Sequence, residues 1–209
     1  MIRNYLKIAW RNLLKNKLYS FINIFGLAIG LTCFLLISLY VLEELSYDRY
    51  FKDTERIYRV NSDIKFGGAD QRMAVSSDPF GATLKKDYAE VEQYTRLYTN
   101  NSSRFIKKGS EFLVENNCLH ADSTLLDIFL LNILEGNSKK VLTEPNTIII
   151  SQTAAKKYFD NTSALGKTLT IGLQNPVEYK VTAVYEDMPT NAHFQANMIF
   201  SFANITDYR

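Results

Sequence analysis

Residues 18–42 form an unbroken run of twenty-five residues without a formal charge. As a helix, at about 1.5 Å of rise per residue, this run is roughly 37 Å long. The hydrocarbon core of a bilayer is about 30 Å thick, so the helix can cross it with some tilt. Fifteen of the residues are Leu, Ile, Phe or Val, and on insertion scales they contribute about −5 to −9 kcal/mol before the polar residues are counted against them. The run therefore predicts a transmembrane helix, and with it a chain that folds in two environments.

The charges on the two sides of the run have opposite signs. Cytoplasmic flanks of membrane helices are rich in Lys and Arg, so we expect the N-terminus in the cytoplasm and the larger part of the chain outside. Five of the 24 basic residues lie before the run, so 19 basic and all 22 acidic residues lie after it, and we expect no nucleic-acid partner. The flanking cations are Arg3, Lys7, Arg11, Lys15 and Lys17, and the flanking acids are Glu43, Glu44 and Asp48.

A cleaved signal peptide is the alternative interpretation of this N-terminus. The apolar segment of a signal peptide is shorter than this run, and a small-residue cleavage site follows it. Residues 43–46 have the sequence Glu-Glu-Leu-Ser, which offers no such site. We therefore expect an uncleaved membrane anchor.

Residues 1–17 have the pattern of a basic amphipathic helix. Apolar residues recur at helical spacing, while Arg3, Lys7, Arg11 and Lys15 follow one another at a strict four-residue interval. Such a helix lies in the inner-leaflet interface with its cations near anionic headgroups, a position that also suits Trp10. The alternative is a solvated cytosolic tail that is helical only in part, but it would leave an apolar stripe in water. The lipid bilayer is thus the first partner that we expect.

Within the predicted span, Gly26 and Gly30 form a small-xxx-small step, with Asn23 about one turn earlier. Small residues at this spacing let the backbone of a second helix approach closely, and an amide side chain can donate a hydrogen bond to it. Because Gly is common in membrane helices in any case, the same residues are also compatible with a lone anchor. We expect Asn23, Gly26 and Gly30 to be a helix-packing face.

The part after the span is long enough for a folded domain with its own core. Residues 43–56 carry a partial apolar stripe and predict a helical stalk that continues the membrane helix. Residues 57–209 mix strand-like and helix-like segments, so the expected fold class is α+β: one N-terminal transmembrane helix followed by a mixed α/β extracytoplasmic domain. Proline and glycine punctuate its later strands and suggest a smaller β-rich subdomain near residues 145–190.

Periodicity and turn residues give the expected elements of this domain. Gly67 and Gly68 mark the turn of a hairpin, and Asp122 is expected to be the N-cap of a short helix. Strands are expected at residues 56–66, 71–77, 91–99, 104–108, 111–121, 147–151, 167–171, 177–186 and 194–202, and helices at residues 79–90, 122–129 and 152–159.

Residues capable of catalysis or metal binding are few. His120 and His193 are the only imidazoles, and Cys118 with His120 is a two-ligand fragment without the partners that a closed zinc site needs. The sequence beginning at Gly166 echoes the end of a phosphate-binding loop, but Asn161 stands where that loop requires its first glycine. We therefore expect no catalytic, metal-binding or cofactor-binding residues, and no enzyme activity in this chain.

Several longer runs resemble one family of membrane proteins. They resemble the permease subunits of MacB/FtsX-type ABC transporters, and the Bacteroidetes branch of that family in particular. The opening run from Asn4 to Gly30 resembles the start of these permeases, and the later runs resemble their stalk and their MacB-like periplasmic core domain. These later runs are Glu44-Leu-Ser-Tyr-Asp-Arg-Tyr-Phe, Arg56-Ile-Tyr-Arg-Val, Glu144-Pro-Asn-Thr-Ile-Ile-Ile-Ser, Leu165-Gly-Lys-Thr-Leu and Asp187-Met-Pro-Thr-Asn-Ala-His-Phe.

The resemblance implies a noncatalytic role in the bacterial inner membrane, with the main domain in the periplasm. In this family a separate cytosolic ABC ATPase subunit binds and hydrolyses ATP, and two permease copies form the membrane dimer. The periplasmic domain moves in response to the membrane helices, which the family calls mechanotransmission, and it can engage a periplasmic partner. The cargo differs among members, so the resemblance names no substrate.

The family pattern continues with three or more further membrane helices, which are absent from these 209 residues. We expect the sequence to be a fragment of a longer permease, and the alternative within the family is a degenerate single-span protein. A function of another class, a single-span sensor or adaptor anchored in the membrane, is also compatible with the topology. A sensor would need a cytosolic signalling domain, for which residues 1–17 are too few.

Overall fold

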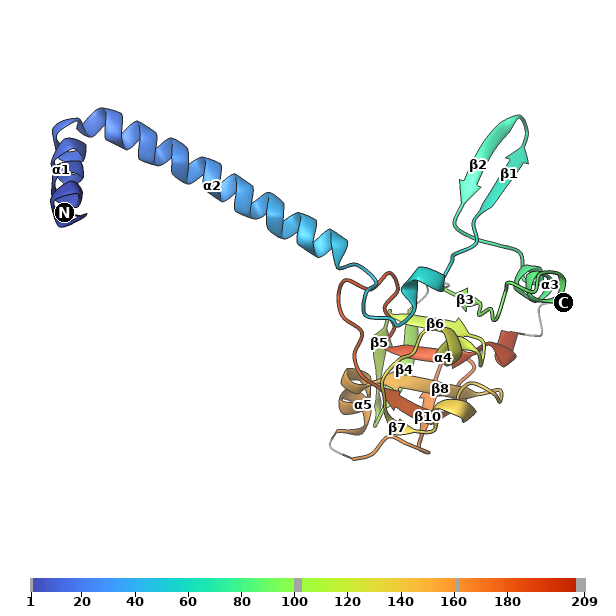
Figure 1. The fold of residues 1–209 in the computed structure, drawn as a ribbon. Helices are drawn as coiled ribbons and strands as arrows, with labels where there is room; N and C mark the ends of the chain where they lie inside the picture. Colours follow the sequence, from blue (N-terminus) through green and yellow to red (C-terminus); the bar gives the residue numbers. More distant parts are fainter. Residues whose placement is uncertain (1, 100–102, 161, 206–209) are drawn as a thin grey trace. The chain divides into compact units, whose positions relative to one another are not determined.

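The computed structural model describes residues 2–99, 103–160 and 162–205. The chain divides into two compact units, Met1–Tyr47 and Asp48–Arg209, which are drawn in Figure 1. The fold is mixed α/β with an apolar helix near the N-terminus, which confirms the expected fold class.

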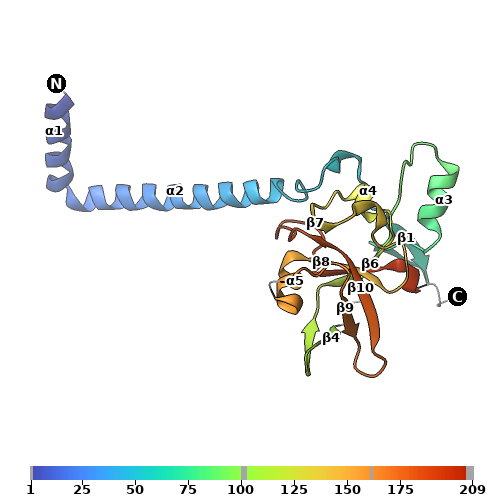
Figure 2. The ribbon, with the colours of Figure 1, turned by 90° about the horizontal axis from the view of Figure 1, so that it is seen from below.

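The first unit consists of two helices, α1 (Ile2–Lys15) and α2 (Lys17–Leu45). Asn16 separates them, and the ribbon changes direction sharply there (Figures 1 and 2). The Ser20 hydroxyl donates a hydrogen bond of 3.1 Å to the carbonyl oxygen of Leu13 across this bend. α2 is long and apolar enough to cross a membrane. None of its residues is buried within the first unit, as expected for a helix that lipid or another helix covers.

The predicted helical stalk over residues 43–56 is wrong beyond Leu45. α2 ends there, and the chain continues through turns into the short 3₁₀-helix η1 (Thr54–Arg56). Asp48 and Asp53 have positive φ angles of 59° and 55°, a conformation that no α-helix contains. The physical reason is Phe51, which enters the core of the second unit with 4% of its surface exposed. Burying that ring outweighs the weak periodic preference of the segment for a helix.

The second unit is built on one nine-stranded sheet with the order β3-β6-β11-β8-β10-β9-β4-β5, in which β7 also pairs with β10. The pairs β8 with β10 and β6 with β11 are parallel, and the other pairs are antiparallel. The strands are β3 (Leu97–Tyr98), β4 (Arg104–Lys108), β5 (Glu111–Glu115), β6 (Cys118–Ala121), β7 (Ile133–Gly136), β8 (Thr147–Ser151), β9 (Thr168–Ile171), β10 (Val177–Tyr185) and β11 (Met198–Ser201).

The core lies on both faces of the central strand β8, whose five residues are all buried. Side chains of a strand alternate between the two faces. Ile149 accordingly belongs to one hydrophobic cluster with Phe51, while Ile148 and Ile150 belong to a second cluster. Helix α4 (Leu125–Ile128) contributes to the first cluster and helix α5 (Gln152–Phe159) to the second. A continuous apolar strand is what a strand covered on both faces requires.

Several expected elements have different limits in the structure. The strands between residues 145 and 190 belong to the nine-stranded sheet and do not form a separate sheet, contrary to the expected β-rich subdomain. The expected strand at residues 56–66 begins only at Ser62, the one at 91–99 shortens to β3, and the one at 111–121 breaks into β5 and β6. Strand β7 was not predicted. By contrast, the structure confirms β4, β8 and α5 with the expected bounds.

A hairpin and a helix stand beside the sheet. The hairpin consists of β1 (Ser62–Phe66) and β2 (Ala69–Met73), which pair only with each other among the described strands. Helix α3 (Phe80–Asp87) follows it. In Figure 1 the hairpin extends away from the nine-stranded sheet, while strands β6, β8 and β10 lie in the body of the unit.

Candidate functional site

The candidate site is the entry segment, which we define as residues 48–59, where the chain enters the second unit. The structure brings this segment against the loop of residues 187–194, which joins β10 to the approach to β11. The Asp48 amide donates a hydrogen bond of 3.0 Å to the Asn191 carbonyl oxygen. In return the His193 amide donates to the Asp48 carboxylate at 2.5 Å. The run that begins at Glu44 and the run from Asp187 to Phe194, which are far apart in the sequence, are therefore in contact in the structure.

An aromatic cluster fixes the entry segment in the core. The rings of Phe51 and Phe194 stack with their centroids 5.5 Å apart and their planes at 10°. Phe129 meets both of them edge to face, with both centroid distances at 5.0 Å. Tyr50 touches Phe51 at 5.3 Å in a similar edge geometry. Ring pairs of these geometries add about 0.5–1.5 kcal/mol each beyond the burial of apolar surface, so this cluster holds the entry segment firmly.

A polar contact lies at the exposed side of the same junction. Arg59 Nη1 and His193 Nε2 are 2.6 Å apart. A guanidinium can only donate a hydrogen bond, so His193 Nε2 is the acceptor and its proton lies on Nδ1. Both side chains are exposed, and a contact of this kind contributes little to stability.

The other end of the loop is tied to helix α5. The Asp187 carboxylate accepts hydrogen bonds from the Thr153 amide at 3.0 Å and from the Thr153 hydroxyl at 2.7 Å. Burial raises the pKa of Asp187, but these two hydrogen bonds, together with one from Ser151 and the charge of Lys156, outweigh that effect and hold the pKa below its usual value. The carboxylate also lies at the positive end of α5. The loop thus connects the entry segment to α5 and, through the chain, to the two strands β10 and β11.

The predicted N-cap role of Asp122 is wrong. Thr124 occupies the N-cap position of α4. The Asp122 carboxylate instead accepts hydrogen bonds from the Arg96 amide at 2.8 Å, from Nε at 3.0 Å and from Nη2 at 2.7 Å. A two-pronged pairing with a guanidinium is stronger than a cap of a one-turn helix. Arg96 also lies over the ring of Phe202, 3.9 Å from its centroid, so Asp122 fixes a structural cation.

Of the residues that were considered for metal binding, His120 is buried and Cys118 is partly buried, whereas His193 is exposed. Burial lowers the pKa of His120 to about 4 and raises the pKa of the Cys118 thiol to about 12. The His120 ring packs on Phe200 with centroids 5.2 Å apart, and the Cys118 thiol is 3.9 Å from the carbonyl oxygen of Glu115. Within the described ranges there is no group of three or more His, Cys, Asp or Glu residues that could hold a metal ion.

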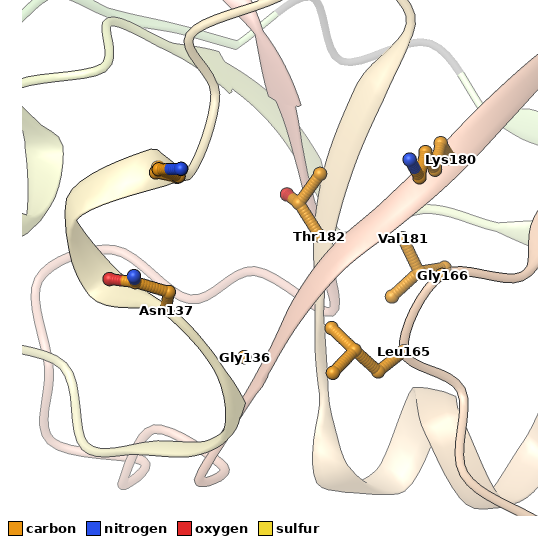
Figure 3. Close-up of a pocket in the computed structure, with 8 residues that line it drawn as sticks. Gly136, Asn137, Leu165, Gly166, Lys180, Val181 and Thr182 are labelled. Carbon is orange, nitrogen blue, oxygen red and sulfur yellow. The ribbon is translucent and has the colours of Figure 1, made fainter.

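The Gly166-Lys167-Thr168 sequence is a turn that leads into β9. The Gly166 amide donates a hydrogen bond to the Val181 carbonyl oxygen at 2.8 Å, and the Lys167 amide donates to Ala164 at 3.1 Å. Amides that are already bonded cannot cradle a phosphate. The open hollow of about 500 Å³ beside this turn is shown in Figure 3. It is lined by Gly136, Asn137, Lys140, Leu165, Gly166, Lys180, Val181 and Thr182.

The predicted packing face of Asn23, Gly26 and Gly30 lies on α2 in the first unit. A Cβ atom placed on Gly26 or on Gly30 would meet nothing within 4 Å in this single chain. The small-residue face is therefore open to a neighbouring helix, and its use stays a prediction. The aromatic partner Phe129 of the entry segment was not foreseen, because its sequence neighbourhood is an ordinary apolar run without a periodic signal.

Comparison with known proteins gives one family. Residues 20–208 match the family described as MacB-like periplasmic core domain. No curated protein matches the chain. The chain is similar to a domain assigned to a permease from Porphyromonas gingivalis, at 25% identity and a TM-score of 0.43, covering 52% of this chain and 48% of that one.

Two further solved structures are similar. One is the periplasmic region of MacB from Actinobacillus actinomycetemcomitans, at 19% identity and a TM-score of 0.45, covering 60% of this chain and 54% of that one. The other is the extracellular domain of the noncanonic ABC-type transporter YknZ from Gram-positive bacteria, at 23% identity and a TM-score of 0.38, covering 51% and 54%. The chain thus spans about half the length of the solved structures it matches.

Proposed function

Because the chain belongs to the family of MacB-like periplasmic core domains, we propose that it serves in a permease subunit as the element that carries helix motion to the periplasmic domain. Domains of this family are parts of ABC transporter permeases and are not a recognised enzyme family. In this proposal α2 crosses the bacterial inner membrane with its N-terminus in the cytoplasm. The unit from Asp48 onward lies in the periplasm. The basic residues before residues 18–42 and the acidic residues directly after them support this orientation.

The observation that carries the proposal is the short and firmly anchored connection after α2. The helix ends at Leu45, and Asp48 is already hydrogen-bonded to Asn191 and His193. Only Ser46 and Tyr47 lie between the helix and the first of these bonds. A long flexible linker would absorb a displacement of the helix, whereas a connection of two residues leaves less chain in which to absorb it. The displacement then reaches α5 through the loop that ends at Asp187.

The proposal requires partners that this chain does not contain. A cytosolic ABC ATPase subunit supplies the energy of ATP hydrolysis, and a second permease copy completes the membrane part. Asn23, Gly26 and Gly30 supply a face on which a helix of that complex can pack. A periplasmic protein is expected to receive the motion, for export or for remodelling of the envelope.

Isolation of the native complex tests this function. The gene product carrying an N-terminal tag is purified from native membranes in mild detergent, and the bound proteins are identified by mass spectrometry. We expect an ABC ATPase subunit. A stable envelope complex without any ATPase would contradict the proposal and favour a single-span sensor or adaptor.

A second experiment tests transmission itself. In the purified complex, protease cleavage of the periplasmic unit is compared with and without ATP. We expect the cleavage pattern to change with ATP in the parent complex and to lose that dependence in Phe51→Ala, while ATP hydrolysis persists. Phe112→Ala, a partly exposed aromatic residue on β5, is the matched control and should keep the dependence. Retention of the dependence in Phe51→Ala would place the transmission elsewhere.

A further inference from the structure

Two neighbouring loop residues, His193 and Phe194, contact the entry segment at three points. At its start, the His193 amide donates a hydrogen bond to the Asp48 carboxylate at 2.5 Å. In its middle, the Phe194 ring stacks on Phe51. At its end, His193 Nε2 accepts a hydrogen bond from Arg59 Nη1 at 2.6 Å. Of the three contacts, only the last involves an imidazole, the side chain that ordinarily changes its charge between about pH 5 and pH 8.

The contact between Arg59 and His193 requires a neutral imidazole. A neutral imidazole has one nitrogen that accepts a hydrogen bond, whereas both nitrogens of an imidazolium donate. The guanidinium of Arg59 also only donates, and it keeps its proton in proteins. A proton on His193 Nε2 would therefore place two donors and two positive charges 2.6 Å apart. Protonation of His193 is incompatible with this contact.

The Asp48 carboxylate offers the protonated imidazole another partner. It already lies against the His193 amide, and an imidazolium and a carboxylate attract each other and form charge-assisted hydrogen bonds. Arg59 and Asp48 are the two charged groups that contact His193 in the described part of the chain. The other charged residues of the entry segment and of the loop form no hydrogen bond or ion pair with His193 there; they are Arg49, Lys52, Asp53, Glu55, Arg56 and Asp187.

The Arg59 side chain is also the polar attachment of residues 58–61. Among the described residues, no other hydrogen bond or ion pair joins this stretch to the rest of the chain. Burial holds it weakly, since Tyr58 is 84% exposed. Only residues 60 and 61 separate Arg59 from the β1–β2 hairpin, which extends away from the nine-stranded sheet (Figure 1). Loss of the contact with His193 therefore frees this stretch, while the start of the entry segment stays held.

We propose that the contact between Arg59 and His193 is a pH-sensitive latch, which holds residues 58–61 at neutral pH and releases them when His193 is protonated. Both side chains are exposed, so a proton reaches the imidazole without unfolding of the unit. For the same reason the contact adds little to the free energy of unfolding, and its loss changes the stretch and not the fold. Histidine protonation at such contacts is a general basis of pH sensors. The inference rests on the proposed function, because it adds regulation to the same junction and assumes that this unit lies in the periplasm, where the pH can follow the surroundings.

A spin label on the released stretch tests the latch. The full chain is placed in lipid vesicles in a Cys33→Ser, Cys118→Ala background, so that Val60→Cys carries the only nitroxide label. The mobility of the label is followed by electron paramagnetic resonance between about pH 8 and pH 5. Lys107→Cys, an exposed position on β4, is the control label. We expect the mobile fraction at residue 60 to rise several-fold along a single-proton titration curve, and the mobility at residue 107 to stay constant.

Two substitutions of His193 separate its protonation from other effects of acid. His193→Gln keeps a hydrogen-bond acceptor that gains no proton in this range, so the label at residue 60 should stay immobile throughout. His193→Lys is positively charged throughout and should leave the label mobile at every pH. No pH response in the parent chain, an unchanged response in His193→Gln, or an equal response at residue 107 would each overturn the proposal. These measurements involve no ATPase, so their failure leaves transmission through Phe51 standing, and the ATP-dependent cleavage at neutral pH tests that function separately.

Discussion

Replacement of Phe51 by alanine is the sharpest test of the junction between the membrane helix and the folded unit. Phe51 is 4% exposed and contacts three other rings, those of Tyr50, Phe129 and Phe194. Removal of a buried Phe side chain typically costs about 3–5 kcal/mol through lost burial and the cavity that remains. The tight aromatic contacts place Phe51→Ala in the upper part of that range. Because whole domains are stable by only about 5–15 kcal/mol, this is a large fraction of the total.

The expected change in melting temperature follows from the size of the unit. For a domain of the length of Asp48–Arg209, each kcal/mol shifts the melting temperature by roughly 2–4 °C. Phe51→Ala should therefore lower it by about 8–20 °C. The exposed Phe66 provides the control, and Phe66→Ala should change the free energy of unfolding by no more than about 0.5 kcal/mol.

The chain supplies its own probe for this assay. Burial raises the pKa of the Cys118 thiol to about 12, so the folded unit should react slowly with a thiol-reactive fluorogenic dye and the unfolded unit quickly. A Cys33→Ser background in detergent micelles leaves Cys118 as the only thiol. If Phe51→Ala melts within about 2 °C of the Phe66→Ala control, residues 48–56 do not anchor in the core and the reasoning fails.

Three further predictions address other parts of the chain. Burial lowers the pKa of His120 from 6.5 to about 4, so the unfolded chain binds a proton at a higher pH than the folded unit does. The unit should therefore lose stability as the pH falls from 6.5 to about 4. His120→Leu should reduce that loss in thermal melts followed by circular dichroism. Gly136→Ala should destabilise the unit by about 1–3 kcal/mol, because a Cβ on Gly136 would lie 2.6 Å from the backbone oxygen of Thr182. Gly166→Ala should have a smaller effect, because a Cβ on Gly166 meets nothing within 4 Å. Equal effects of the two substitutions in denaturant melts would contradict this prediction. Gly30→Leu should leave the melting temperature unchanged but weaken assembly of the native complex, and unchanged assembly in detergent would mean that the small-residue face is idle.

The buried Glu115 carboxylate is the centre of an ionic hydrogen-bond network in the second unit. The Glu115 carboxylate accepts hydrogen bonds from Lys157 at 2.7 Å, Tyr158 at 3.0 Å and Asn197 at 2.7 Å. Burial raises the pKa of Glu115, but these bonds together outweigh it and lower the pKa below the usual value. A carboxylate that accepts three hydrogen bonds fixes the packing of β5, α5 and the approach to β11. It belongs to the scaffold that receives the entry segment.

The sequence alone determined the features that depend on neighbouring residues. The uncharged run of residues 18–42 predicts an apolar helix because helix length and composition are local properties. The bounds of β8 and α5 followed from a continuous apolar run that ends at Ser151, whose hydroxyl caps the helix by accepting a hydrogen bond from Ala154. The alternation of residues at 62–66 likewise predicted a strand that leads to the glycine turn of the hairpin.

Only the tertiary structure decided which distant residues meet. The spacing of apolar residues in 43–56 is compatible with a helix, yet in the structure Phe51 packs against Phe129 and Phe194. Asp122 likewise pairs with Arg96 and does not cap a helix. Burial energy and charge pairing depend on partners far along the chain, and a local pattern contains no record of where those partners lie. The order of the nine strands brings them together, and with them the junction through which we propose that this protein works.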